Sequence, residues 1–205
     1  MAAFGVGAYS LVCVYFIVGS AVTKVKLKQK QAEGIAEARG GLRGPGSVWG
    51  SGSAGIICAA AALSGLTSLP LNLWRLGFVA SFCSKLSDTT ASEIGKAYGK
   101  TTYMSTPPFH RVPRGTEGAV SLEGTLAGVA ISLAFAGFAL FMGQLNGMID
   151  VGTCVFAAFV ATTFESMLGC LVQRRDGFKW LTNDIVNGIQ ISLAAAVAIA
   201  IGNGK

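Results

Sequence analysis

The chain has 205 residues, of which 52% are hydrophobic and only 13% are charged, with 16 Lys and Arg against 10 Asp and Glu. Soluble domains carry about 25% charged residues, so this composition excludes an ordinary water-soluble domain and favours a membrane protein. The net charge of +6 does not indicate nucleic-acid binding, because no basic stripe with interleaved aromatic residues accompanies it.

Six apolar blocks are expected to cross a membrane. The first, residues 2–22, carries no charge and is long enough, as a helix, to cross a hydrocarbon layer of ~30 Å. The other blocks are residues 48–66, 69–84, 126–142, 151–172 and 185–201. The third is the weakest, because Arg75 interrupts it. The sequence therefore predicts an all-α, polytopic membrane helix bundle, a single domain over residues 1–205, with a polar loop between the third and fourth spans.

Basic residues gather in alternate connections between these spans. Residues 23–47, 85–124 and 173–183 contain 14 of the 16 Lys and Arg. Such asymmetry is typical of loops on the cytoplasmic side of a membrane. We therefore expect these three connections to share one side and both termini to lie on the other.

Glycines four residues apart recur near the predicted spans. Gly124 and Gly128 are one such pair, and Gly95 with Gly99 and Gly143 with Gly147 are similar. Because small residues let helix backbones approach closely in membranes, Gly124 and Gly128 are expected to lie at a tight helix–helix contact.

Acidic and basic residues alternate directly after the third block. On a helix, Lys85, Asp88 and Ser92 would share one face, with Glu93 and Lys96 on the adjacent stripe. Carboxylates at a membrane edge suit Mg²⁺, which prefers oxygen ligands, and lysines suit phosphate charge. A solvated helix end with ion pairs one turn apart explains the same pattern, so both interpretations stay open.

A second polar cluster, residues 111–125, directly precedes the fourth span. Its candidate ligands are Arg111, Arg114, Gly115, Glu117, Gly118 and Glu123. Glycine allows backbone N–H groups to point at an anion, and a helix N-terminus favours negative charge. The cluster therefore suits a metal-bound polyphosphate, with a plain surface loop as the alternative.

Ionisable residues also occur in the last two spans. Glu165 lies about two turns inside the fifth block, where such a group is costly and usually faces the bundle interior. It is expected to pair with Lys85, Arg174 or Arg175, or to approach a bound metal. Asp184 opens the sixth block, either as a helix cap or as part of the site.

Several strings in this chain resemble the phytyl-phosphate kinases of tocopherol synthesis and the wider integral-membrane family around them. They are KLSDT at 85–89, ASEIGK at 91–96, GKTT at 99–102 and RVPRGTEGAVSLEGT at 111–125, with further likeness over residues 23–52 and 183–187. The resemblance implies transfer of the terminal phosphate of a nucleoside triphosphate, with CTP the expected donor, to phytyl phosphate or a related prenyl phosphate. The product would be phytyl diphosphate. It also implies a chloroplast membrane in a photosynthetic eukaryote, or the plasma or thylakoid membrane in a cyanobacterium.

Site roles follow from the residues and from the chemistry that this resemblance implies. Mg²⁺ is expected on Asp88, Glu93, Glu117 and Glu123, which form the predicted catalytic set. The phosphates are expected on Lys85, Lys96, Lys100, Arg111 and Arg114, with Gly115 and Gly118 in the anion-binding loop.

Two other functions stay open. A lipid-phosphate nucleotidyltransferase would need a similar site. A membrane transporter is disfavoured, because its polar residues would lie within the membrane in matching halves of the chain. The expected partners are a prenyl phosphate and membrane lipid, without nucleic acid, and a homo-oligomer stays open.

Overall fold

The structure, a computed structural model, describes residues 2–37, 44–65, 68–172, 177–178 and 180–204. Its elements are α1 (Gly5–Thr23), α2 (Leu27–Ala32), α3 (Pro45–Ser64), α4 (Leu71–Tyr98), β1 (Thr102–Met104), β2 (Ala119–Ser121), α5 (Leu122–Phe141), α6 (Met148–Leu171) and α7 (Asn183–Asn203). The predicted all-α bundle is confirmed. The sequence did not predict the two short antiparallel strands β1 and β2, in which Thr102 lies opposite Ser121.

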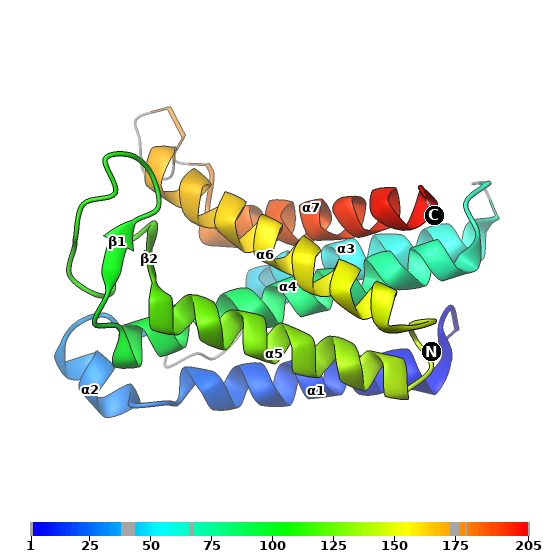
Figure 1. Cartoon of the computed structure of the whole chain (residues 1–205), viewed down its shortest axis with the longest axis horizontal. Helices are drawn as coiled ribbons and strands as arrows, with labels where there is room; N and C mark the ends of the chain where they lie inside the picture. Colours follow the sequence, from blue (N-terminus) through cyan, green and yellow to red (C-terminus); the bar gives the residue numbers. More distant parts are fainter. Residues whose placement is uncertain (1, 38–43, 66–67, 173–176, 179, 205) are drawn as a thin grey trace.

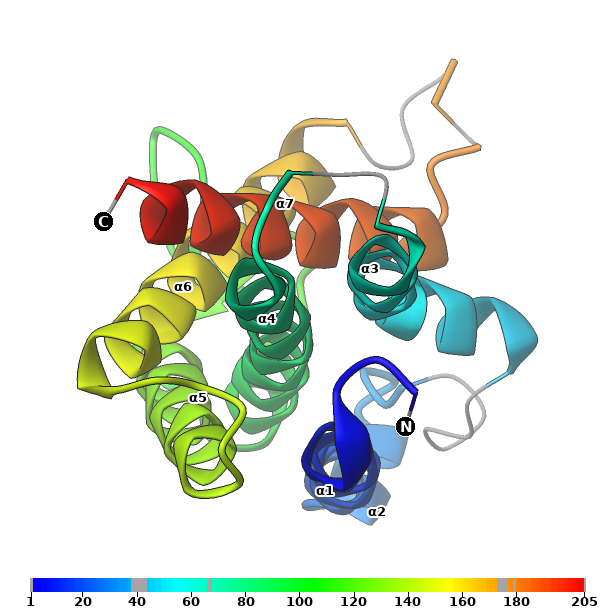
Figure 2. The same cartoon turned by 90° about the vertical axis from the view of Figure 1, so that its right-hand side faces the viewer.

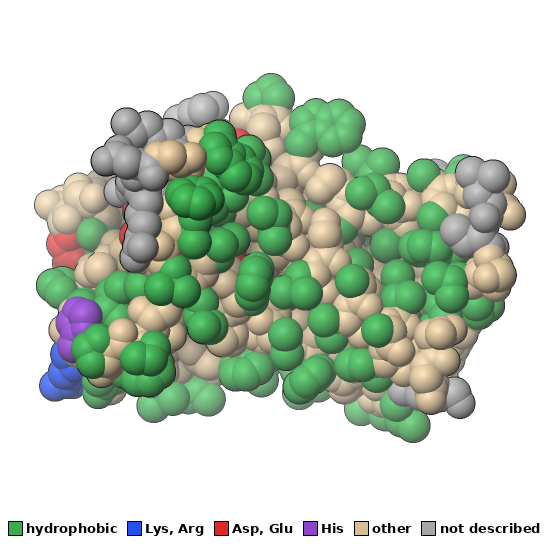
Figure 3. All heavy atoms as spheres, turned by 90° about the horizontal axis from the view of Figure 1, so that it is seen from above, with side chains coloured by type: hydrophobic (Ala, Val, Ile, Leu, Met, Phe, Trp, Pro, Cys, Tyr) green, Lys and Arg blue, Asp and Glu red, His purple; other side chains and the backbone are tan. Residues whose placement is uncertain are grey.

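The long helices run between two ends of the molecule that differ in kind (Figure 1). One end carries α2, β1 and β2, and we call it the polar end. Both chain termini lie at the opposite end, as the alternation of spans predicts. The space-filling view agrees, because the acidic, basic and His side chains visible in it lie in the half toward the polar end, whereas hydrophobic side chains are spread over the whole face (Figure 3).

Helix α4 is the centre of the bundle. It packs against α1, α3, α5, α6 and α7, and the end-on view shows it among these helices (Figure 2). Residues 76–87 are all buried, so no face of this segment meets lipid. A helix that is buried on all sides belongs to the core of the protein.

Five helices are long and apolar enough to cross a membrane by themselves: α1, α3, α5, α6 and α7. Helix α4 has 28 residues but carries several charges. Because the other helices surround it, its polar residues face protein groups rather than hydrocarbon. These five helices and α4 together give the six spans that the sequence predicts.

The polar loop predicted between the third and fourth spans is corrected in its first part. Residues 85–98 continue α4 as helix, and only residues 99–121 form a connection, which includes β1 and β2. The charges that made this segment resemble a loop are largely paired within the protein, as described below. The other five spans begin up to four residues from the predicted positions.

Glycines bring α4 and α5 into close contact. A Cβ atom at Gly124 would lie 2.4 Å from the carbonyl oxygen of Ala91, and one at Gly128 would lie 3.1 Å from that of Ser87. The Ser87 hydroxyl donates to the carbonyl of Gly128 at 3.0 Å. The predicted tight contact at Gly124 and Gly128 is confirmed, whereas nothing lies within 4 Å of a Cβ at Gly143 or Gly147.

Part of the predicted charge asymmetry lies outside the described residues. The basic residues that the structure does not describe are Arg39, Arg43, Arg174, Arg175 and Lys179. The predicted ion pairs of Glu165 with Arg174 or Arg175 therefore also lie outside the described residues.

Candidate functional site

A cavity of about 1540 Å³ opens at the polar end. We call it the polar-end cavity. Its walls come from the polar ends of α1 and α3–α7, from β1 and β2, and from the segments 34–37 and 114–118. Most of the predicted site residues line it: Lys85, Asp88, Glu93, Lys96, Arg114, Gly115, Glu117 and Gly118. The structure therefore brings residues from both predicted polar clusters to one space.

Lys85 connects α4 to α7 in the wall of this cavity. Its buried ammonium donates to the Asp88 carboxylate at 2.6 Å and to the side-chain carbonyl of Asn187 at 2.9 Å. Glu165 on α6 interacts electrostatically with Asp88 and with Lys85. Helices α4 and α7 thus fix Lys85 and Asp88 where the bundle opens toward the polar end, and Glu165 of α6 lines the same cavity.

Glu117 adds a third carboxylate from the connection between the strands. It lines the same cavity, and its charge acts on Glu165. The predicted ion pair of Glu165 with Lys85 is not formed, because Lys85 donates to Asp88 and Asn187 instead. Among the described residues, no group of three or more His, Cys, Asp or Glu is arranged tightly enough to hold a metal by itself.

Glu93 is held by two lysines. It forms a buried ion pair with Lys30 of α2 and a second pair with Lys96 at 3.2 Å. The Lys30 ammonium also donates to the carbonyl of Thr23 at 2.9 Å. Glu93 is only 2% exposed and Lys30 only 1%, so this pair joins α2 and the end of α1 to α4. The expected ion pair one helical turn apart is therefore present between Glu93 and Lys96. The expected solvated helix end is wrong at Glu93, because this residue is buried.

The segment after α2 supplies acidic partners to the cationic rim of the cavity. Arg114 pairs with Glu33 and donates to the carbonyl of Ala97 at 3.4 Å, while Lys96 lies 3.5 Å from the carboxylate of Glu37. Hydrogen bonds from Gln29 and then Arg114 hold the pKa of Glu33 below its ordinary value. Lys96 and Arg114 thus line the cavity while paired with Glu37 and Glu33.

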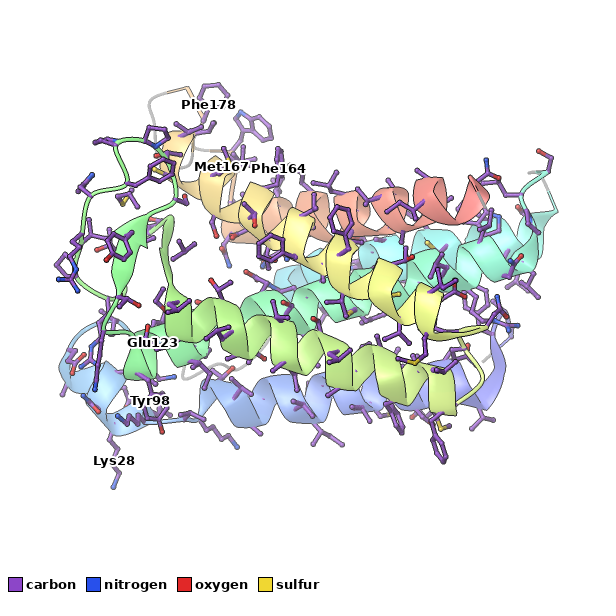
Figure 4. The ribbon with its side chains drawn as sticks, viewed as in Figure 1. Lys28, Tyr98, Glu123, Phe164, Met167 and Phe178 are labelled. Atoms are coloured by element: carbon purple, nitrogen blue, oxygen red, sulfur yellow. The ribbon has the colours of Figure 1, made fainter. Side chains whose placement is uncertain are left out.

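Glu123 has a local structural role. Its carboxylate accepts hydrogen bonds from the Thr101 hydroxyl at 2.9 Å and from the backbone N–H of Lys100 at 3.1 Å. Glu123 does not line the polar-end cavity. In the view of Figure 4 it is labelled at the start of α5, apart from the residues labelled on α6. The structure therefore separates Glu123 from Asp88 and Glu117.

Lys100 and Arg111 also lie outside the cavity lining. Lys100 is exposed. Arg111 faces the ring of Tyr103 at 5.8 Å, a cation–π distance, and the two residues pair as an isolated antiparallel bridge. Neither cation is positioned with Lys85, so the predicted phosphate-binding group divides into cavity residues and surface residues.

Gly115 and Gly118 allow close packing of the connection. Both have positive φ, +83° and +73°, which non-glycine residues rarely adopt. A Cβ at Gly115 would lie 2.5 Å from Ile35, and one at Gly118 would lie 2.7 Å from the backbone of Cys170. These contacts fix the segment that carries Arg114 and Glu117 between the segment after α2 and the end of α6.

The N-terminus of α5, expected to attract an anion, is capped by the protein. The Ser121 hydroxyl accepts from the N–H of Gly124 at 3.1 Å, and the Thr101 hydroxyl accepts from the N–H of Leu122 at 3.4 Å. Asp184 starts α7 beside Gly46, where a Cβ would lie 2.4 Å from its carboxylate. The helix cap of α7 is Thr182, whose hydroxyl accepts from the N–H of Ile185 at 3.4 Å, so Asp184 is not that cap.

Two members of the site had no role in the sequence-based prediction. Lys30 is one of four evenly spaced lysines and has no local signal that distinguishes the buried one. Asn187 opens the sixth block, but its contact with Lys85 joins residues 102 positions apart. A polar amide inside an apolar block was the available signal for Asn187.

Comparison with known proteins agrees with the expected membrane family. Residues 1–195 match the family described as "Integral membrane protein DUF92". The chain is 52% identical over 198 residues, 96% of its length, to "Protein VTE6, chloroplastic" of Arabidopsis thaliana. It covers 59% of that protein, less than two thirds of its length.

Two prokaryotic membrane proteins are similar as well. An uncharacterized membrane protein of Synechocystis is 52% identical over 98% of this chain and 76% of its own length. One of Methanocaldococcus jannaschii is 30% identical over 93% of this chain and 74% of its own. No solved structure matches the chain.

These matches confirm the expected location in a membrane of the chloroplast or cyanobacterial type. The match to the family model extends over almost the whole chain, and the described residues include five helices that could cross a membrane besides the central helix α4. The chain therefore belongs to the DUF92 family of integral membrane proteins.

Proposed function

We propose that this protein is a membrane phosphotransferase that moves the terminal phosphate of a nucleoside triphosphate, CTP in the first instance, to phytyl phosphate. The product is phytyl diphosphate, a precursor for tocopherol synthesis. The observation that carries the proposal is the polar-end cavity, in which Lys85, Asp88 and Asn187 form a fixed network where the membrane bundle opens. Such a cavity suits a ligand with a charged head and an apolar tail.

Phosphoryl transfer depends mainly on positioning and on neutralising charge. Lys85, Lys96 and Arg114 offer three cations around one space. Lys85 is held by Asp88 and Asn187, so its position is fixed before a ligand binds. We assign Lys85 to the acceptor phosphate, because it is the deepest of the three, and Lys96 and Arg114 to the donor phosphates.

The transfer itself needs no strong base. An oxygen of the acceptor phosphate forms a bond to the terminal phosphorus of the donor, and the bond from that phosphorus to the bridging oxygen breaks. A nucleoside diphosphate leaves, and its developing charge is stabilised by the donor-binding cations. The acceptor is already anionic at neutral pH, so no proton has to be removed from it.

Magnesium fits the carboxylates of the cavity. Mg²⁺ is usually bound by one or two carboxylates together with substrate phosphates, rather than by a complete protein cage. Asp88 and Glu117 line the cavity, and Glu165 lines it as well. We assign Asp88 and Glu117 as the carboxylates that would hold the ion together with the substrate phosphates, with Glu165 in the same cavity wall. The ion would neutralise phosphate charge when bound. The loose arrangement of these carboxylates agrees with an ion that shares its ligands with a nucleotide.

Glu93 and Glu123 receive positioning roles in this proposal. Glu93 holds Lys96 at the rim through one carboxylate oxygen. Glu123 holds the backbone at Lys100 and Thr101, which leads into β1. Neither residue then has to leave its partners for the reaction to proceed.

The proposal is tested with purified protein in detergent, phytyl phosphate, Mg²⁺ and each nucleoside triphosphate in turn. We expect phytyl diphosphate and a nucleoside diphosphate, and we expect loss of transfer when Mg²⁺ is chelated. Release of pyrophosphate with a nucleotidyl lipid as product would instead identify a nucleotidyltransferase. No product with any triphosphate would refute the proposal.

A transporter is less compatible with the fold. Transporter sites usually lie near the middle of the membrane between broken helices of two repeats. Helix α4 is continuous over 28 residues, and the charged network lies toward one end of the bundle. These features favour chemistry at one membrane surface.

A further inference from the structure

The polar-end cavity extends along α6 into the depth of the membrane. Its α6 wall contains Phe159, Thr163, Ser166 and Gly169. Phe159 lies near the middle of α6 and ten residues before Gly169, which is ~15 Å along a helix. That length is about half of a hydrocarbon layer of ~30 Å. The cavity therefore joins a polar end to a depth where the surroundings are apolar.

The deep part of the cavity lies between α5 and α6. From α5 it is lined by Thr125, Gly128 and Val129, of which Gly128 also contacts α4. The two helices lie close at their connection and separate toward the polar end, as two perpendicular views show (Figures 1 and 2). The cavity thus occupies the space where these helices diverge.

Phe159 and Thr163 mark a lateral opening of this space. They lie one helical turn apart, and both line the cavity while remaining exposed, Phe159 by 46%. Neighbouring exposed residues, Phe164 and Met167, do not line it and lie on the side of α6 turned away from α5 (Figure 4). Phe159 and Thr163 therefore form the edge between the cavity wall and the lipid-facing side of α6.

The threonine hydroxyls of this wall already have hydrogen-bond partners within α6 and do not need a polar ligand. Thr163 donates to the carbonyl of Phe159 at 2.8 Å, and Thr162 donates to that of Ala158 at 2.5 Å. Hydroxyl groups satisfied within their own helix can border an apolar chain without losing a hydrogen bond. The part of the wall at Phe159, Thr162 and Thr163 is thus compatible with hydrocarbon, and Glu165 and Ser166 follow it toward the polar end.

From these features we infer that the α5–α6 opening is the lateral entrance and binding groove for the isoprenoid chain of the lipid phosphate. The chain lies between Val129 and the edge formed by Phe159 and Thr163, and its phosphate reaches Lys85. This assignment rests on the proposed function and adds the path by which a substrate leaves the bilayer without passing through water. We identify the occupant as a lipid phosphate because its anionic phosphate suits the cationic end of the cavity and its isoprenoid chain suits the apolar opening.

The test is a bulky substitution at the edge. Thr163→Trp should obstruct the opening, and Phe164→Trp is the matched control on the adjacent residue outside the cavity. We expect Thr163→Trp to lower kcat/KM for phytyl phosphate roughly tenfold or more, the equivalent of expelling about two methylene groups from an apolar site. The value for dimethylallyl phosphate, whose chain is too short to reach the edge, should stay near that of the wild type.

Photocrosslinking of the wild-type protein gives a second measurement that needs neither a variant nor turnover. An alkyl phosphate with a diazirine at its tail, in detergent without nucleotide, should label α5 and α6 peptides that contain Val129 and Phe159. Excess phytyl phosphate should prevent labelling, and phosphatidylglycerol should not. Equal competition by both lipids would mean that the groove holds ordinary bilayer lipid and would overturn the inference.

The outcomes separate this inference from the proposed function. Equal loss of activity on long and short substrates in Thr163→Trp, or no loss on either while the wild type is active, would overturn the groove and leave the phosphotransferase proposal intact. Labelling confined to helices other than α5 and α6 would overturn it as well. A wild type that is inactive with every triphosphate but is labelled in the groove would refute the proposed reaction and support the lipid path.

Discussion

Removal of one charge from the buried pair of Glu93 and Lys30 should destabilise the protein strongly. Glu93→Gln keeps the shape of the side chain but leaves the Lys30 ammonium, 1% exposed, without its anion. The carbonyl of Thr23 remains as a partner at 2.9 Å, which is insufficient for a full charge. Breaking a buried pair from one side costs ~3–5 kcal/mol. At roughly 2–4 °C per kcal/mol for a chain of this size, Tm should fall by at least about 6 °C.

Thermal unfolding in detergent, followed by circular dichroism, measures this effect. The double variant Glu93→Leu with Lys30→Met removes both charges and should regain most of the loss, since apolar replacement of a buried pair is often neutral. Glu33→Gln is the matched control at a half-exposed pair with Arg114 and should change Tm little. If the Tm of Glu93→Gln equals that of the wild type, the argument that the buried ion pair stabilises the protein is refuted. If the double variant is stable but transfers phosphate more slowly, Glu93 is needed to position Lys96 as well as for stability.

Three further outcomes are expected. Asp88→Asn should reduce phosphoryl transfer roughly 10²-fold or more while membrane insertion and the elution volume in detergent stay unchanged; normal transfer would remove Asp88 from the site. Gly124→Ala should destabilise by ~1–3 kcal/mol, because the new Cβ would lie 2.4 Å from the carbonyl oxygen of Ala91. Gly137→Ala in the same helix meets nothing within 4 Å and should be neutral or stabilising by ~0.5–1 kcal/mol; equal effects in thermal unfolding would contradict the packing argument. The pKa of Glu33 lies below 4.5 in the folded protein because of Gln29 and then Arg114, so its stabilisation is present above pH 4.5 and is lost as pH falls through the lowered pKa. The small difference in Tm between the wild type and Glu33→Gln should therefore disappear in acid, and a difference that grows in acid would reverse the sign of this argument.

Much of the candidate site could be located from the sequence, but its internal arrangement could not. Asp88, Glu117 and Arg114 were expected together because both polar clusters lie in the same connection, and all three line the cavity. Glu123 belongs to the same run of residues as Glu117, yet it turns to Thr101. Spacing along a chain does not decide which way a side chain points when the backbone changes from strand to helix between the two residues.

The sequence by itself determined the number of spans, their approximate bounds and the side on which the termini lie. These properties depend on the lengths of apolar blocks and on the charges between them. Both are local, because each segment enters the membrane according to its own length and flanking charges.

Only the tertiary structure decided that α4 lies at the centre and that residues 85–98 continue this central helix with paired charges. A charged helix is stable there because other helices exclude lipid from it and supply partners, such as Asn187 for Lys85 and Lys30 for Glu93. Those partners are 102 and 63 residues away along the chain. A pairing over such distances arises from the packing of whole helices, so no local pattern could have predicted it.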